Sequence, residues 1–414
     1  MIDERTQEIL TERLVNRIEK LNEEILVVIG RRLKQIGNLN VSQIYQIRQM
    51  LLYGEDLNKI VKKIAEISEL NIKDIYKIFE EEAKVNQSFA KQFYKAKGID
   101  FIPYAQNIPL QNQVRALATI TAQKIANINN LSNIGYLVID KNGNEVFKNV
   151  TEAYSTIIDN AIINITQGKM TFNEELRKIV NTAGKGGLRT IAYESQYVGA
   201  DGQLHYRTRR LDSAVRMNML DGIRTLTNEI QQQFGKEFGA DGIEISVHEN
   251  PAVDHAPIQG HQFSIEEYNN MQSTMPFKDY QGRNYEPIER HISEYNCYHY
   301  TFPILLGISK QMRSDKELKE ILDNNEKGFE FEGKHYTNYE GTQLQRKIET
   351  EIRKWKDLQI FGKASGNKEV VGNAQSKITQ LTNKYKKLSQ ISGLKTKMDR
   401  MRVSGYKRIN INKM

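Results

Sequence analysis

The sequence predicts a mainly α-helical, elongated protein of several segments with one small α+β module. Two observations lead to this prediction: apolar residues recur at spacings of three and four over most of the 414 residues, and five of the seven prolines gather within 241–310. A charged fraction of 27% and an apolar fraction of 39% suit helices with much exposed surface. We expect four regions: 1–105, N-terminal helices; 106–240, central helices with hairpins; 241–310, a Pro/His-rich module; and 311–414, a C-terminal helical hairpin with a basic tail.

The first region has one clear apolar face. Its residues recur at helical spacing and are Leu10, Leu14, Ile18, Leu21, Ile25 and Val28. Further helices are expected around 41–52 and 57–67. In "NIKDIYKIFEEEA" we expect Asn71 to cap a new helix, with Asp74 in its first turn, where a carboxylate suits the free amides.

The central region begins where Pro103 and Pro109 interrupt the helical pattern. Asn142-Gly143 lies between two alternating apolar stretches and predicts a β-hairpin, with a helix–loop–helix as the alternative. The turn "GADG" at 199–202 predicts a second hairpin. Helices are expected at 114–128, 151–166, 173–182 and 212–234. The glycines of "AGKGGLRT" fit no phosphate-loop motif and predict a helix end.

The C-terminal region predicts two helices, "EGTQLQRKIETEIRKWKDL" and "AQSKITQLTNKYKKLSQI", joined by the loop "GKASGNKE". The basic tail at 384–414 follows, with ten Lys/Arg against Asp399 alone, a net charge of +9. The chain's net charge is +8, so the other residues together sum to about −1. Such a run indicates an electrostatic contact with nucleic acid or an acidic protein face. A solvated helical surface is the alternative.

No apolar run approaches the ~20 residues that span a bilayer, and the charged start "MIDERTQEIL" lacks a signal core. We therefore expect no membrane span. A single cysteine cannot form an intramolecular disulfide, which agrees with synthesis in the cytoplasm.

The Pro/His-rich module contains candidate metal ligands. A structural zinc site needs four N or S ligands, usually from two short clusters. His248 and His255 come from one cluster, and Cys297 and His299 from the other; at i and i+2 of an extended segment, the latter two share a face. His261 is a spare candidate, and His291 is less well placed. Scattered histidines with a buried, apolar cysteine are the alternative.

Catalytic motifs fit this module poorly. His248-Glu249 lacks the second histidine of H-E-x-x-H, because Ala252 stands there, and no G-x-S-x-G elbow occurs. A metal-dependent nuclease or hydrolase, with His255 or His261 activating water, is the alternative function, although no paired carboxylates accompany the histidines. A free nucleic-acid-binding protein would rest on the tail alone. We expect no enzyme activity.

The order "ISVHENPAVDHAPIQGHQF", then "NCYHYTFPILLGIS", closely resembles the signature of the phage minor capsid protein 2 family, head-morphogenesis proteins of phages of Gram-positive bacteria that are related to the Mu F type. The positions that match are Ser246, His248, His255, Ala256, Gln259, Gly260, Asn296, Cys297, His299, Phe302, Pro303, Gly307 and Ser309. Tyr298 stands where the family usually has arginine, and Ile258 where an aromatic is common.

The resemblance covers most of the chain and is most specific over 190–310. It implies a virion component in the capsid interior or at the portal vertex, made in the host cytoplasm and present in few copies. The implied partners are the portal protein and the major capsid or scaffold components. Inside a head, the basic tail at 384–414 would face packaged DNA, and such phosphate contacts weaken with salt.

Overall fold

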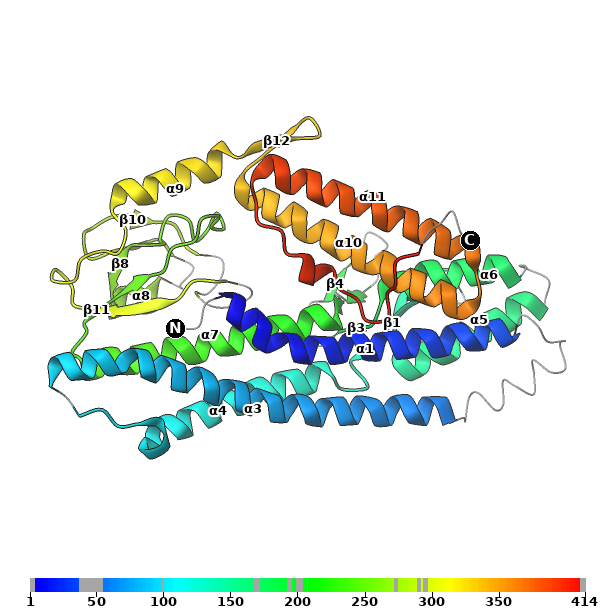
Figure 1. Ribbon diagram of the computed structural model, residues 1–414, viewed down its shortest axis with the longest axis horizontal. Helices are drawn as coiled ribbons and strands as arrows, with labels where there is room; N and C mark the ends of the chain where they lie inside the picture. Colours follow the sequence, from blue (N-terminus) through cyan, green and yellow to red (C-terminus); the bar gives the residue numbers. More distant parts are fainter. Residues whose placement is uncertain are drawn as a thin grey trace.

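The computed structural model describes residues 4–36, 55–98, 100–140, 142–166, 172–191, 196–198, 204–206, 208–271, 275–288, 292 and 297–409. Figure 1 shows an elongated molecule in which long helices run along the longest axis and a small sheet-containing module lies at one end. This confirms the predicted fold class. Among the described helices, none is long and apolar enough to cross a membrane.

Four long helices form the body of the molecule: α1 (Glu4–Ile36), α3 (Glu55–Lys97), α4 (Ile108–Ile128) and α7 (Leu211–Glu237). Helix α7 packs against the other three, and Figure 1 shows all four lying lengthwise. Of the predicted apolar face of α1, Leu14, Ile18, Leu21 and Ile25 are buried in a core that continues through α3, α4 and α7, and Val28 packs against this core partly buried. The first two predicted regions thus share one core.

The expected helix start at Asn71 is wrong, because α3 runs unbroken from Glu55 to Lys97. Asn71 is fully buried and accepts a hydrogen bond from Arg17 Nη1 at 3.0 Å. Asp74 pairs with Arg17 Nη2 at 2.6 Å. The two residues that resemble a cap are instead the polar contacts between α3 and α1. The helix expected around 41–52 lies outside the described residues.

The central region contains the predicted Asn142-Gly143 hairpin, formed by β1 (Ile134–Ile139) and β2 (Glu145–Asn149). The short strands β3 (Arg189–Thr190) and β6 (Arg209–Arg210) extend it into a sheet of order β2-β1-β3-β6. A separate pair, β4 (Gln196–Val198) and β5 (Leu204–Tyr206), confirms the second hairpin, although its turn lies outside the described residues.

Helix predictions in this region are close to the structure. They correspond to α4, to α5 (Val150–Thr166), to α6 (Phe172–Ile179) and to α7. The segment expected to stop at 182 continues as a π-helix, Val180–Gly184, which packs on the C-terminal region.

The Pro/His-rich module is built on a small antiparallel sheet of order β11-β7-β8. Its strands are β7 (Gly242–Ile245), β8 (Gln262–Ser264) and β11 (Thr301–Ile304), with the short helix α8 (Ile265–Asn270) and the pair β9 (Phe277–Lys278) and β10 (Asn284–Tyr285) beside it. Its apolar core is separate and small, and consists of Ile243, Ile245, Ile258, Phe263, Tyr268, Met271, Phe277, Tyr285, Ile288 and Ile292.

The C-terminal region contains the predicted helical hairpin, α10 (Asn338–Ser365) and α11 (Lys368–Ser392). Its connection is shorter than expected, because Gly366 caps α10 in the left-handed conformation and the Asn367 side chain accepts from Val370 N. Helix α9 (Asp315–Lys327) and a hairpin not predicted from the sequence, β12 (Phe329–Phe331) and β13 (Lys334–Tyr336), precede it. We call α1, α3, α4, α7, α10 and α11 together the helical frame.

The basic tail packs against the helical frame. We call residues 393–409 the C-terminal strap; Figure 1 shows it in red, running back beside α10 toward α1. Met401, in its 3-10 turn η3 (Met398–Met401), is buried, and its carbonyl accepts from Lys356 Nζ at 2.6 Å. Ser404 donates to Glu23 at 2.6 Å, and Arg402 pairs with Glu12 at 3.3 Å.

A buried network of charges joins three elements of the frame. Arg210 Nη1 lies 2.7 Å from Asp357 on α10, and Arg353 Nη1 lies 2.8 Å from Asp212 on α7. Asn22 on α1 donates to Asp357 at 3.0 Å. Burial alone would raise the pKa of Asp212, but Arg210 and Arg353 hold it well below its usual range. Both carboxylates have cationic partners, as buried charges require.

Glu19 lies at the edge of this network and is nearly buried. Burial, followed by the charge of Asp212, raises the pKa of Glu19 to about 7, while Arg353 and Arg210 act in the opposite direction. The frame therefore contains a carboxyl group that titrates near neutral pH.

Candidate metal centre

Two segments of the Pro/His-rich module bring three of the four predicted ligands together. His255 comes from the turn-rich loop between β7 and β8, and Cys297 and His299 come from the extended residues before β11. The exposed fraction is 1% for His255 and 3% for Cys297 and His299. One donor atom of each lies within 4.8 Å of the others. These three side chains can therefore reach a single ion.

Sheet pairing explains why the two segments meet. Strand β11 pairs with β7, with Thr301 opposite Ile245. Beyond the strands, Ser246 N donates to Tyr300 O and Tyr300 N donates to Ser246 Oγ, both at 2.8 Å. The chain leaving β7 therefore lies beside the chain entering β11.

The loop that carries His255 is closed by local turns. His255 N and Ala256 N both donate to Ala252 O. Gly260 N donates to Ile245 O at 2.8 Å and has φ +73°, a conformation that favours glycine. A Cβ there would also lie 2.5 Å from Leu318 Cδ2. Gly260 is thus required for the loop to return to the sheet.

The ring orientations suit metal ligation. Cys297 Sγ lies 3.4 Å from His255 Nδ1 and 3.4 Å from His299 Nδ1. The opposite ring nitrogens face acceptors: His255 Nε2 lies 3.4 Å from Asp254 Oδ2, and His299 Nε2 lies 3.3 Å from Gln259 Oε1. With Nε2 protonated, each ring presents a bare Nδ1 toward the thiol. Ligand histidines in metalloproteins are commonly oriented in this way by the outer nitrogen.

The fourth predicted ligand, His248, lies next to this group but outside it. Its ring centroid is 4.4 Å from that of His299, in an edge-to-face arrangement. The three donors within 4.8 Å of one another do not include a His248 nitrogen. Its role as a fourth ligand stays a prediction.

His261 is placed away from the three-donor group, with its ring 6.1 Å from that of Tyr285. Burial and the charge of Arg283 lower its pKa. His261 lies near the ion pair of Asp279 and Arg283, and not in the group of donors around Cys297. His291 lies outside the described residues.

The sequence did not indicate that Gln259 and Asp254 lie against the outer ring nitrogens of His299 and His255. Gln259 Oε1 accepts from His248 N at 2.8 Å and also faces His299 Nε2, so one amide oxygen positions both histidines. Asp254 precedes His255 directly and Gln259 follows it by one helical turn. A search for acceptors at these spacings from a predicted ligand would have identified both.

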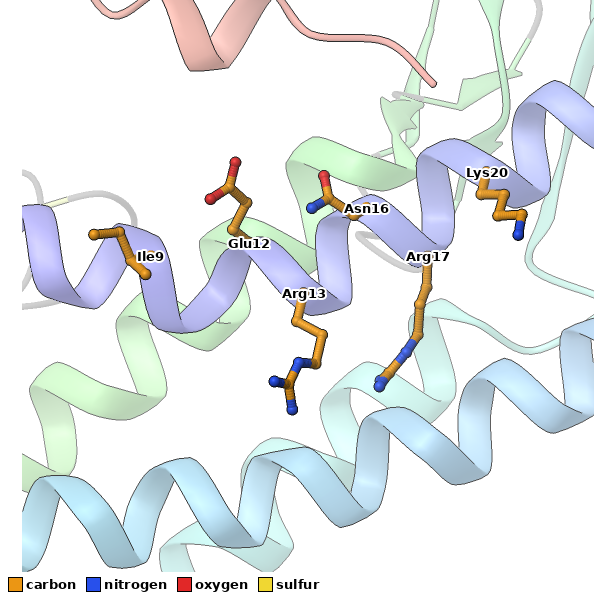
Figure 2. Close-up of a pocket in the computed structure, with 6 residues that line it drawn as sticks. All are labelled: Ile9, Glu12, Arg13, Asn16, Arg17 and Lys20. Carbon is orange, nitrogen blue, oxygen red and sulfur yellow. The ribbon is translucent and has the colours of Figure 1, made fainter. Parts of the chain in front are cut away.

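A shallow groove of about 470 Å³ on α1 is a separate feature. Its lining residues are Ile9, Glu12, Arg13, Asn16, Arg17 and Lys20, and Figure 2 shows Arg13 and Arg17 extending toward α3. Both guanidinium groups are near Asp74, at 3.6 and 2.6 Å. The groove is therefore lined by α1 alone, and its two arginines are engaged with Asp74 of α3.

The donor set of the three-residue group has a clear preference. Thiolate and imidazole ligands suit zinc and other first-row transition ions, whereas magnesium and calcium prefer oxygen. Burial of all three donors fits an ion held within the fold.

Comparison with known proteins supplies the family. Residues 2–389 match the family model described as phage minor capsid protein 2. No curated protein and no solved structure matches the chain significantly. The match spans nearly all of the helical frame and the whole Pro/His-rich module, so this chain belongs to the phage minor capsid protein 2 family and is a virion component.

Proposed function

We propose that this minor capsid protein is a structural, non-enzymatic component of the phage head that binds the portal protein during procapsid assembly. The observation that supports portal binding most is a set of large aliphatic side chains exposed on α3, on α4 and between them: Leu70, Val85, Ile102, Ile108 and Ile120. Long helices that expose such side chains offer a surface on which a partner subunit can pack.

Portal binding is tested by co-purification of the two proteins after co-expression. We expect Ile108→Asp with Ile120→Asp to abolish co-purification, since a buried carboxylate in an apolar interface is strongly unfavourable. The matched control is Ile391→Asp, which alters an exposed isoleucine on α11. Portal recovery that is equal for all variants would contradict this surface, and no recovery with the wild-type protein would contradict portal binding itself.

Zinc is the proposed ion of the metal centre. His255, Cys297 and His299 supply three ligands, and His248 would complete a tetrahedral set after a small adjustment of its ring. A zinc ion with four protein ligands has no position for a substrate. Its contribution is then to pin the loop that carries His255 to the strand that carries Cys297.

The alternative, a metal-dependent nuclease, requires an open coordination position that a phosphodiester can approach. The burial of all three donors disfavours it. A direct test is incubation of the zinc-loaded protein with duplex and single-stranded DNA and with RNA. Cleavage that His255→Ala abolishes would overturn the structural proposal.

Contact with packaged DNA is proposed for cations of the basic tail whose side chains stay exposed. These are Lys386, Lys387, Lys395, Lys407 and Arg408. Arg402 and Lys384 are partly neutralised by Glu12 and Glu332. DNA affinity measured against salt should give a slope that falls by about 0.9 for each phosphate contact removed by a Lys→Gln change. If the variant in which all five of these cations are replaced by glutamine shows the same dependence of DNA affinity on salt as the wild-type protein, DNA contact by the tail is contradicted.

A further inference from the structure

The residue between the two strand ligands of the metal centre connects that centre to the end of the chain. Cys297 and His299 direct their side chains to the centre. The Tyr298 ring, between them, lies edge-to-face against His248, with 6.1 Å between ring centroids, and its hydroxyl reaches the strap. Its hydroxyl accepts a hydrogen bond from Arg400 Nη2 of the C-terminal strap at 3.1 Å. Residues 297–299 are therefore held from two sides.

Two further cations surround the Tyr298 ring. The guanidinium carbon of Arg224, fully buried on α7, lies 4.3 Å from the ring centroid, and Lys397 Nζ of the strap lies 5.8 Å from it. Cation–π contacts strengthen when they are shielded from water. The ring thus joins the metal centre, α7 and the strap.

The strap is anchored around this contact. Lys397 N donates to Tyr385 Oη of α11 at 2.9 Å, and Met401 is buried in the cluster that also contains Tyr385. Arg400 therefore sits between two backbone anchors. A shift of Tyr298 would be transmitted to a short, ordered segment.

We infer that zinc occupancy of the centre and docking of the C-terminal strap are coupled through Tyr298. The inference rests on the proposed zinc centre. Ligation of Cys297 and His299 fixes the backbone of residue 298 and so presents its ring and hydroxyl to Arg224 and Arg400. Coupling between two binding events is reciprocal, so strap docking tightens zinc binding by the same factor by which zinc tightens docking.

The coupling has a consequence for assembly. The strap holds Arg402, Lys407 and Arg408, and docking pairs Arg402 with Glu12. Loss of zinc frees Arg402 from Glu12 and zinc uptake pairs the two again, whereas Lys407 and Arg408 are exposed even when the strap is docked. The metal centre thereby controls how much of the basic tail is available to anionic partners.

The first arm of the test measures zinc affinity of the full chain by competition with a chromophoric chelator. Arg400→Met removes the strap's hydrogen bond without touching a ligand, and we expect zinc to bind about tenfold more weakly. Arg408→Met is the matched control, because it removes an exposed arginine of the same strap; we expect a change within about twofold. Tyr298→Phe, which keeps the ring, should weaken zinc binding about threefold.

The second arm follows tryptic cleavage after Arg402 and Lys407 by intact mass. In the wild-type protein, we expect removal of zinc by a chelator to accelerate cleavage about tenfold. In Arg400→Met, cleavage should be fast with and without zinc. Equal zinc affinity for Arg400→Met and Arg408→Met, or strap cleavage unaffected by the chelator, overturns the coupling alone. Absence of bound zinc in the wild-type protein overturns the zinc centre and the coupling together.

Discussion

The helical frame and the Pro/His-rich module are stabilised in different ways. The frame buries a continuous apolar core across long helices, from Leu14 on α1 to Phe361 on α10. The module has strands of only two to four residues and a small core of its own. Small cores rarely stabilise a fold without a metal or crosslink. We therefore expect the frame to depend on apolar burial and the module to depend on the zinc ion proposed at His255, Cys297 and His299.

Removal of a metal ligand should have the largest effect, because it should destabilise the module and leave the frame folded. We expect Cys297→Ser to lower the free energy of unfolding of the module, measured in the presence of zinc, by at least about 5 kcal/mol. The serine hydroxyl is a weaker zinc ligand than the thiolate, and the free energy of zinc binding contributes directly to the free energy of folding. The module should become protease-sensitive, while far-UV circular dichroism retains the signal of the frame. The measurement is limited proteolysis with mass mapping, alongside circular dichroism.

His335→Ala is the matched control for histidine loss, because His335 is exposed on β13 and pairs with Glu330. Zinc content and proteolysis should be unchanged. If Cys297→Ser and His335→Ala give the same zinc content and the same proteolysis pattern, the module does not depend on metal.

A cavity in the core of the helical frame should have the opposite effect: it should lower the stability of the frame and leave the metal centre unchanged. Phe79 on α3 is fully buried, and a Cβ at Gly222 of α7 would lie 2.9 Å from Phe79 Cζ, so the two helices meet closely there. We expect Phe79→Ala to lower the free energy of unfolding by about 3–5 kcal/mol. Zinc affinity should be unchanged, as measured by chelator competition.

Leu70→Ala on the same helix is the control, because Leu70 is 46% exposed. It should cost less than about 0.5 kcal/mol in urea unfolding. Equal losses for Phe79→Ala and Leu70→Ala would show that the α3–α7 contact is not part of the stabilising core.

The stability of the frame should also respond to pH near neutrality. The pKa of Glu19 is raised from 4.5 to about 7, so the folded state holds the proton more tightly than the unfolded state. This cost of ionisation is absent below pH 4.5, grows between pH 4.5 and 7, and is complete above pH 7. Glu19→Gln should therefore stabilise the protein by about 3 kcal/mol at pH 8 and not at pH 4.

Urea unfolding of Glu19→Gln and the wild-type protein at both pH values measures this difference. Other carboxylates titrate in both proteins and cancel in the comparison. Glu12→Gln is the control, because it changes a partly exposed carboxyl group of the same helix. A stabilisation by Glu19→Gln that is the same at pH 4 and pH 8 would contradict a raised pKa.

Much of the fold outside the Pro/His-rich module could be predicted from the sequence, because its signals are local. Helix periodicity and the Asn142-Gly143 turn depend on neighbours along the chain, and α5, α7 and the β1–β2 hairpin follow them closely. Asn71 shows where local signals fail. Its capping chemistry was overridden by the hydrogen bond from Arg17, a residue 54 positions away.

The candidate site was predictable in its residue types and not in its geometry. The i, i+2 spacing correctly placed Cys297 and His299 on one side. The separation of His261 from the group, and the position of His248 beside it, depend on how the loop returns to β7 through Gly260. The contact of Tyr298 with Arg400 spans 102 positions and leaves no local pattern.

The smallest effect that we predict is the loss of a helix cap, and the same capping motif occurs in the module and in the frame. Ser264 caps α8 of the module and Thr337 caps α10 of the frame, each in a reciprocal capping box with a glutamate three residues on. Ser264→Ala and Thr337→Ala should each cost about 1 kcal/mol, because each leaves a first-turn amide without its acceptor. The cost should appear in different measurements: Ser264→Ala in the protease sensitivity of the module and Thr337→Ala in global urea unfolding. Since both changes delete equivalent hydrogen bonds, an equal effect of the two variants on global unfolding would mean that module and frame unfold as one unit.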